Sequence, residues 1–210
     1  MTDWTEIANA DELGALLGEP TAAALAKERS VLTDVDRDWL AASPFCVIAT
    51  ADADGNLDVS PKGDPAGSLA HVVDDSTIAI AERPGNRRAD GYRNILQNPH
   101  VGLNFLIPGR GDTLRINGRA RLISDAPFFD EMVVKGHRPL LAVVVEIDTV
   151  FFHCAKAFLR SQLWKPETWD PDGVVPRRAV ISHAMEKKDK SVEELDEYYG
   201  PAYEAGLYRE

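Results

Sequence analysis

The sequence predicts a mainly β protein, an antiparallel barrel with flanking helices. Of its 210 residues, 44% are hydrophobic and 27% are charged, which is a globular composition with enough apolar residues for one substantial core. Five to seven short apolar runs follow one another, separated by turn residues. A helical pattern interrupts the series once, so the regular strand–helix alternation of a parallel sheet is absent.

We expect one domain, residues 1–210, in three parts: N-terminal helices (1–42), a barrel core (43–164) and a C-terminal extension (165–210). Residues 3–42 carry apolar side chains at three- and four-residue spacing and are rich in Ala, Leu, Lys and Glu, which is typical of helices. Pro44 ends this region.

The first half of the barrel core has clear strand signals. The β-branched run "FCVIAT" at 45–50 is followed by an Asp-Gly-Asn turn and a second strand, which predicts a hairpin. Residues 76–82 form another expected strand. Residues 87–98 read as a helix closed by Asn98-Pro99.

The second half continues with strands at 100–107 and 113–124, the latter with a kink or bulge at Gly118. A helix capped by Asp125 follows. Residues 139–154 predict a long buried strand. A further helix is expected at 155–164, and the charged tail reads as a solvated helix that packs on the body or on a neighbouring subunit.

The charge distribution favours a small anionic ligand. The net charge is −11 and the pI is about 4.9, which argues against nucleic-acid binding. Residues 55–121 nevertheless carry nine Lys/Arg and seven Asp/Glu, so the rest of the chain carries −13. No apolar run could span a membrane and no signal peptide opens the chain, so a cytoplasmic location is expected. Cys46 and Cys154 are expected to be buried free thiols.

Four arginines gather in "RPGNRRADGYRN", residues 83–94. Arg83, Asn86, Arg87 and Arg88 lie between an expected strand end and helix start, where free amides and guanidinium groups together suit a phosphate. The alternative is a solvated turn whose arginines pair with acids such as Glu82 and Asp90.

Two other segments offer polar groups. Ser60 and Lys62 share one face of a strand and could reach a phosphate or a flavin ring oxygen, or Lys62 could protect an edge strand. Lys156, Ser161 and Trp164 follow the last strand, where the tryptophan could stack on a ring system or belong to the core. His153 and Cys154 alone do not make a metal site.

Signatures of hydrolytic or dinucleotide-binding enzymes are absent: we find no nucleophile elbow, metalloprotease motif, phosphate-binding P-loop or Gly-rich dinucleotide fingerprint. A ligand that brings its own reactivity therefore fits better than acid–base hydrolysis.

These segments together resemble the pyridoxamine 5′-phosphate oxidase-related, FMN-binding split-barrel family, in particular an uncharacterised bacterial subgroup. The resemblance spans roughly residues 30–170. It is carried by "CVIATADADGNLDVSPKGDP", "IAIAERPGNRRADGYRNILQNPHVGLNFLIPG", "TLRINGRARL" and "FFHCAKAFLRSQLW". It implies a split β-barrel that forms a homodimer with FMN at the subunit interface.

The resemblance also assigns residues. The Gly-Ser-Arg-Lys turn that binds the FMN phosphate in the oxidases reads Gly85-Asn86-Arg87-Arg88 here. In the first hairpin, Ser60 and Lys62 take the flavin-contacting positions. A glutamine of the oxidases falls on Thr113, with Arg115 following.

The C-terminal Trp and Arg segment that covers the vitamin substrate in the oxidases is not present, so pyridoxamine phosphate is not the expected substrate. The resemblance implies an FMN-dependent oxidoreductase acting on a nicotinamide or small organic substrate. The alternatives are a non-enzymatic flavin carrier or sensor, or a member of the fold that binds F420 or haem. Haem would need an axial ligand, for which His153 is the candidate.

Overall fold

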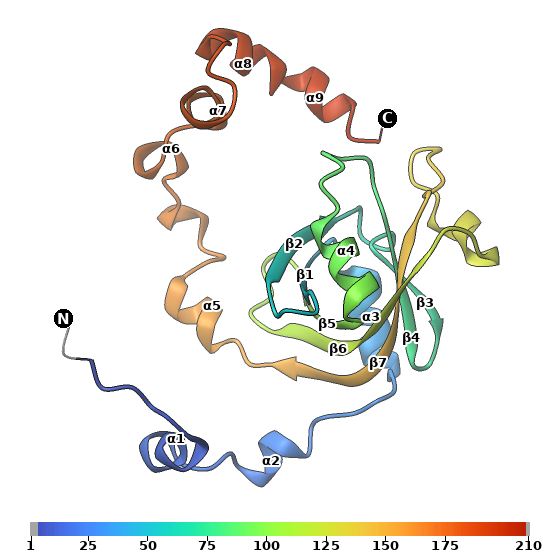
Figure 1. Cartoon of the computed structure of the whole chain (residues 1–210), viewed down its shortest axis with the longest axis vertical. Coiled ribbons are helices and arrows are strands. Elements are labelled where there is room, and N and C mark those ends of the chain that lie inside the picture. Colours follow the sequence, from blue (N-terminus) through green and yellow to red (C-terminus); the bar gives the residue numbers. More distant parts are fainter. Residues whose placement is uncertain (1–3, 209–210) are drawn as a thin grey trace.

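The predicted antiparallel barrel is confirmed by the computed structural model, which describes residues 4–208 except the side chain of Asp172. Seven strands form one sheet in the order β2-β1-β5-β6-β7-β4-β3, and every neighbouring pair is antiparallel. The strands are β1 (Phe45–Ala51), β2 (Leu57–Gly63), β3 (Ala70–Asp74), β4 (Thr77–Ala81), β5 (His100–Leu106), β6 (Thr113–Ile123) and β7 (Ala142–His153). The sheet curls around its core and leaves β2 and β3 as its two edges (Figure 1).

Helices precede, interrupt and follow the sheet. They are α1 (Ala10–Leu17), α2 (Ala22–Leu25), α3 (Asp34–Ala42), α4 (Asp90–Gln97), η1 (Pro127–Met132), α5 (Lys156–Ser161), η2 (Pro166–Thr168), α6 (Pro171–Val174), α7 (Arg178–Met185), α8 (Val192–Tyr198) and α9 (Pro201–Ala205). Within residues 4–208, none of them is both long and apolar enough to cross a lipid bilayer.

The core lies inside the curled sheet. β1 and β5 alternate buried and half-buried residues, as strands with one covered face do. Leu40 of α3 and Ile95 of α4 join the same apolar cluster, so these two helices close the barrel. A second cluster, around Phe129 of η1, packs on the opposite face of β4 and β7.

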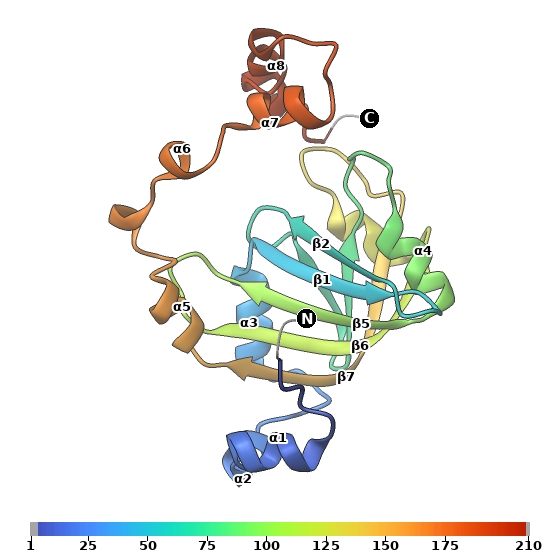
Figure 2. The ribbon, with the colours of Figure 1, turned by 60° about the vertical axis from the view of Figure 1, so that its left-hand side comes forward.

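The outer helices extend well away from the barrel (Figure 2). α1 and α2 lie on an N-terminal arm, and α5 to α9 form a long arc that begins at the end of β7. The chain then returns to the barrel, because the Tyr208 hydroxyl donates to Asp64 at 2.7 Å. The last C-terminal helix, α9, therefore ends close to the barrel, near Asp64.

Three sequence expectations about the helices are wrong. Residues 26–33 are not helical, because Arg29 pairs with Val150 of β7 as an isolated bridge. The helix expected from residue 87 begins at Asp90, because Arg87 and Ala89 adopt positive φ values of 58° and 57°. Asp125 does not cap the next helix, which is a 3₁₀ helix without a side-chain cap; its carboxylate binds Arg138 instead.

One strand and one cysteine also differ from what the sequence indicated. The edge strand β3 was not anticipated, because its sequence "AHVVD" is short and of mixed polarity. Cys46 is buried as expected, and burial raises the pKa of its thiol to about 12. Cys154 is exposed, because it lies just beyond β7 where the chain leaves the barrel.

Candidate functional site

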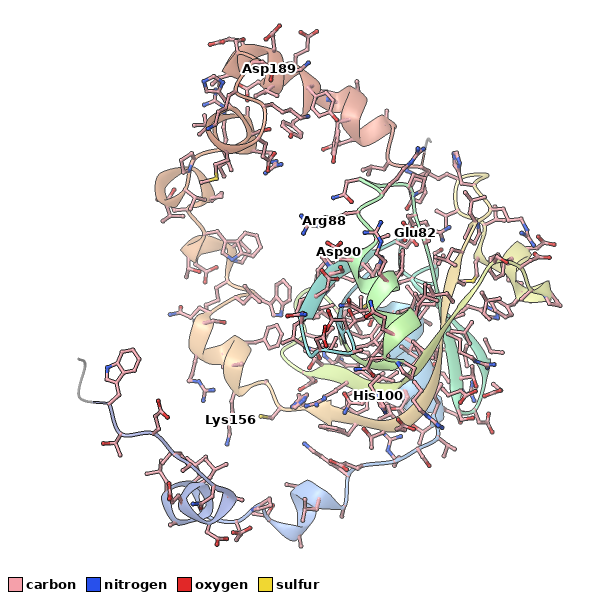
Figure 3. The ribbon with its side chains drawn as sticks, viewed as in Figure 1. Glu82, Arg88, Asp90, His100, Lys156 and Asp189 are labelled. Carbon is pink, nitrogen blue, oxygen red and sulfur yellow. The ribbon has the colours of Figure 1, made fainter. Side chains whose placement is uncertain are left out.

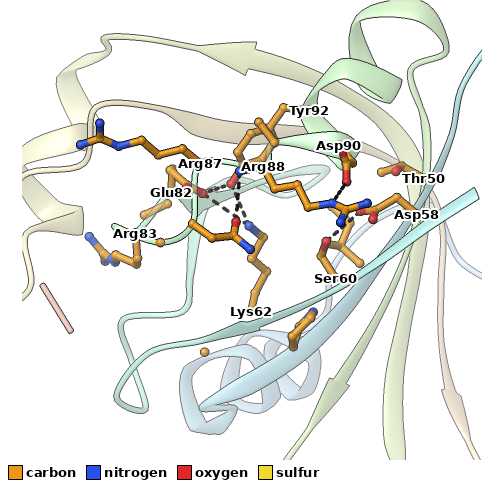
Figure 4. A pocket seen from close by; sticks show the side chains of 18 of the residues that line it. Thr50, Asp58, Ser60, Lys62, Glu82, Arg83, Arg87, Arg88, Asp90 and Tyr92 are labelled. Atoms are coloured by element: carbon orange, nitrogen blue, oxygen red, sulfur yellow. Dashed lines mark hydrogen bonds and ion pairs between the residues drawn. The ribbon is translucent and has the colours of Figure 1, made fainter. Parts of the chain in front are cut away.

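A cavity of about 450 Å³ opens beside β1, β2, the loop 82–89 and the start of α4 (Figure 4). This volume lies in the range of small-molecule sites. The six lining residues that the sequence predicted are Ser60, Lys62, Arg83, Asn86, Arg87 and Arg88. Segments from two hairpins and a helix therefore meet at one place.

Lys62 is held in the cavity by Glu82 and by Tyr92, and Tyr92 was not among the residues that the sequence indicated. Its ammonium group donates to the Tyr92 hydroxyl at 2.7 Å and lies 3.4 Å from a Glu82 carboxylate oxygen. Tyr92 in turn donates to Glu82. The spacing of Ser60 and Lys62 along the strand predicts that they share one face. The sequence did not indicate that α4 turns Tyr92 and Ile95 into the cavity.

Arg88 is partly engaged by acids. Its guanidinium Nε donates to Asp90, and this hydrogen bond raises the pKa of Arg88. Its backbone amide donates to Asn86 Oδ1 at 3.0 Å, which shapes the turn. The alternative interpretation of this turn, arginines paired with nearby carboxylates, therefore describes part of the site.

Arg83 and Arg87 each keep guanidinium N–H groups that have no hydrogen-bond partner among the described residues. Arg83 donates to Asp64 at 2.7 Å and to the Met132 carbonyl at 3.0 Å, but its Nη1 is buried with no hydrogen-bond partner. Arg87 is exposed and makes no hydrogen bond or ion pair with the side chains that the structure describes. Its guanidinium points away from that of Arg88 (Figure 4).

The backbone of the loop also suits an anion. Two non-glycine residues, Arg87 and Ala89, are left-handed on either side of Arg88, and such strained loops often form anion-binding concavities. Ala89 precedes α4 without providing a side-chain cap, so the first amides of this helix lack a capping side chain. Orphaned donors, cations and a cavity of suitable volume together fit a phosphorylated ring compound such as FMN.

Five residues predicted as cofactor contacts lie elsewhere in the same chain. Thr113 is buried in β6 opposite His153, and Arg115 is exposed on the outer face of the sheet, where it donates to Asn117. The other three, Lys156, Ser161 and Trp164, lie on or just beyond α5, and Lys156 is far from Arg88 (Figure 3).

Trp164 is half-buried against the end of the barrel. Its indole nitrogen donates to the Arg110 carbonyl at 2.6 Å, and its ring stacks on Phe158 at a centroid distance of 5.9 Å. This geometry gives the tryptophan a packing role within its own chain.

Metal chemistry gains no support from the part of the chain described. No cluster of three or more His, Cys, Asp or Glu side chains that could hold a metal ion occurs among residues 4–208. His153 does not line the cavity beside β1 and β2. Burial, together with the nearby Arg115 and Lys27, lowers the pKa of His153.

A curled antiparallel sheet with a cationic loop between β4 and α4 defines a split-barrel protein with a small-molecule cavity at its edge. The sequence model of pyridoxamine 5′-phosphate oxidase matches residues 32–154, which is more than half of the chain. The protein therefore belongs to the pyridoxamine 5′-phosphate oxidase family, as its sequence indicated. No curated protein matches the chain significantly.

Several solved structures match part of this chain at low sequence identity. They include a proposed pyridoxamine 5′-phosphate oxidase from Lactobacillus delbrueckii (26% identity, TM-score 0.46, covering 59% of this chain and 95% of that one). An FMN-binding protein from Syntrophomonas wolfei shares 14% identity (TM-score 0.42, covering 56% and 88%). An F420 reductase shares 16% identity (TM-score 0.42, covering 58% and 98%).

Proposed function

We propose that this protein binds FMN in the 450 Å³ cavity and acts as an oxidoreductase on a nicotinamide or small organic substrate. The observation that carries this proposal is the convergence of Ser60, Lys62, Asn86 and three arginines on one cavity in a member of this family. When bound, FMN would supply the redox chemistry by accepting or delivering a hydride at its ring.

The residues of the chain would bind and orient the cofactor. Arg87, Arg88 and the amides around them would hold the phosphate, because guanidinium groups and free helix amides bind phosphate oxygens. Lys62, fixed by Tyr92 and Glu82, would supply a cation for a polar edge of the ring. Within the described residues no acid or base is assigned to the reaction.

A second copy of the chain would complete the site. The side chains of β2 that face the cavity are polar, while those that face outward, Leu57 and Val59, are apolar and 77% and 62% exposed. An exposed edge strand normally has the opposite polarity. On the same outer face, Asn104 Oδ1 is buried without a hydrogen-bond partner. We infer that a partner copy covers this face and brings its own Arg115 or α5 residues to the cavity.

Replacing both phosphate-site arginines tests the proposal directly. The variant Arg87→Ala/Arg88→Ala should bind FMN about 100-fold more weakly, because each charge-assisted hydrogen bond contributes about 1.5–3 kcal/mol and about 1.4 kcal/mol is tenfold in affinity. FMN affinity would be measured by fluorescence titration of the full-length protein.

The control Arg37→Ala/Arg178→Ala removes two arginines whose ion-pair partners, Asp75 and Glu186, lie outside the cavity; it should bind FMN normally. Unchanged affinity in the Arg87/Arg88 variant would contradict the phosphate assignment.

A parallel titration with F420 shows whether the wild-type protein binds FMN more tightly than F420. Reduction of the bound flavin by NADH or NADPH, followed by reoxidation with an added acceptor, distinguishes an enzyme from a flavin carrier.

A further inference from the structure

A second and larger cavity, of about 690 Å³, lies where the C-terminal helices return to the barrel. Its walls are the loop 82–87, the segment 137–140 and residues of α8, α9 and the turn after α9. The two cavities share the loop 82–87, so one loop separates them. The whole α8–α9 wall lies beyond residues 32–154, which match the family.

Large apolar side chains are concentrated in this cavity although each is substantially exposed. Leu140 is 73% exposed, Leu207 is 51% exposed, and Tyr198 and Tyr203 are about half exposed. Exposed apolar side chains that gather in one concavity mark a binding site more often than scattered ones do. The Tyr198 and Tyr203 rings lie 5.8 Å apart, which gives this wall two neighbouring aromatic surfaces.

The charges of the cavity favour an anion. Its lining contains three arginines and a single acid, Glu82. Arg83 is neutralised by Asp64, and Arg138 binds two aspartates at 2.6 and 2.7 Å. Glu82 is occupied by Lys62 and Tyr92. Among the described residues that line this cavity, Arg87 is therefore the arginine without an acidic partner, and it is exposed.

The C-terminal wall is anchored to the barrel. The Tyr208 hydroxyl donates to the buried Asp64. Burial, and after it the hydrogen bond to Asp64, raises the pKa of Tyr208 to about 12. Arg83 and Lys135 lie over the Tyr208 ring, and His137 stacks on it at 6.2 Å. This anchor holds α9 close to the loop 82–87, so the tyrosines and Arg87 can act on one ligand.

We propose that the second cavity binds a planar aromatic carboxylate, with its ring against Tyr198 and Tyr203 and its carboxylate on Arg87. An aromatic ring can pack on the two tyrosine rings, which are tilted by 54° to each other and so offer one stacking contact and one edge contact. A carboxylate matches a guanidinium fork that has no other partner among residues 4–208. This inference goes beyond the proposed function but shares Arg87 with it. A guanidinium group carries five N–H donors, so one edge of Arg87 would hold the FMN phosphate and the other edge the carboxylate.

The probe pair is 2-naphthoate and its uncharged analogue 2-naphthamide, titrated calorimetrically into the full-length protein. Wild type should bind 2-naphthoate saturably, both without FMN and with saturating FMN. Arg87→Gln should weaken 2-naphthoate binding about tenfold or more and leave 2-naphthamide binding unchanged, because only the acid loses a charge-assisted contact. Arg160→Gln, an exposed arginine of α5 outside both cavities, is the matched control.

Tyr203→Ser probes the aromatic wall from a helix outside the first cavity. It should weaken both probes about three- to tenfold and leave FMN affinity at the wild-type value. Three results would overturn the proposal: no saturable binding of 2-naphthoate, equal weakening of both probes by Arg87→Gln, or loss of 2-naphthoate binding on saturation with FMN. The last result would make the second cavity part of the cofactor site. A failure to bind FMN would leave the naphthoate measurement intact.

Discussion

Asp36 shows how one polar side chain fixes the way the N-terminal arm joins the barrel. Its carboxylate is fully buried and accepts hydrogen bonds from both terminal nitrogens of Arg29 and from the backbone and hydroxyl of Thr33. Burial by itself would raise the pKa of Asp36, but the bonds from Arg29 and Thr33 outweigh it and lower the pKa. The same carboxylate completes the capping box of α3.

Asp36→Asn should lower the free energy of unfolding by about 3 kcal/mol at pH 7, because it leaves the Arg29 charge without its buried partner. The ordinary pKa of this group is 3.8 and its folded pKa is lower. The carboxylate therefore stabilises the fold above about pH 4, and this contribution is lost as the pH falls through the folded pKa. Urea unfolding at pH 7, 5 and 3 measures this.

The stability difference between wild type and Asp36→Asn should be equal at pH 7 and 5 and smaller at pH 3. A difference that does not change with pH would contradict the role assigned to the ionised carboxylate.

At the scale of elements, the longest strand pair depends on one glycine. β6 and β7 pair over most of their lengths, and their register shifts between Asn117 and Gly118. The sequence predicted a kink or bulge at Gly118, and this shift confirms it. A Cβ atom on Gly118 would lie 2.1 Å from the Glu146 carbonyl oxygen, so the close approach of the two backbones requires glycine.

Gly118→Ala should lower the free energy of unfolding by about 2–3 kcal/mol, because the added methyl group meets backbone that cannot move without disturbing the ladder. Gly102→Ala in β5 is the control, since its Cβ would meet Asn117 Oδ1 at an ordinary 3.5 Å. Urea denaturation of both variants checks the prediction. Equal stability of the two variants would show that the bulge tolerates a side chain.

At the scale of the whole molecule, the polarity of β2 connects the cavity with assembly. Asp58, Ser60 and Lys62 face the cavity, so the alternating Leu57 and Val59 must face outward. One strand thus serves a polar site on one face and, in our proposal, an apolar subunit contact on the other. Loss of the contact should therefore also weaken the site.

Val59→Asp should convert a dimer into a monomer of 23.1 kDa, because a charge in the centre of an apolar contact cannot be solvated. FMN affinity should fall with it. Val73→Asp, on the other edge strand β3 and 39% exposed, is the control and should stay dimeric. Size-exclusion chromatography with light scattering gives the masses. A monomeric wild type would contradict the proposed interface.

Local patterns were sufficient for much of the fold and for half of the candidate site. Alternation and turn residues located six of the seven strands, and the bulge at Gly118 was recognisable because a glycine lies in the middle of a long strand pattern. Ser60, Lys62 and the residues of the loop 82–88 were named because their spacing and charge are properties of adjacent residues. Tyr92 was missed, since its role depends on the direction in which α4 packs on β1 and β2.

The sequence by itself determined the antiparallel sheet, the family and the cationic loop, because periodicity, turn chemistry and charge are local properties of the chain. Only the tertiary structure decided the use of each arginine: Arg83 binds Asp64, Arg88 binds Asp90, and Arg87 has no partner among residues 4–208. It also brought Tyr208 back to the barrel from 144 residues beyond Asp64. These pairings depend on the packing of distant segments, and no local pattern records which carboxylate a guanidinium will meet.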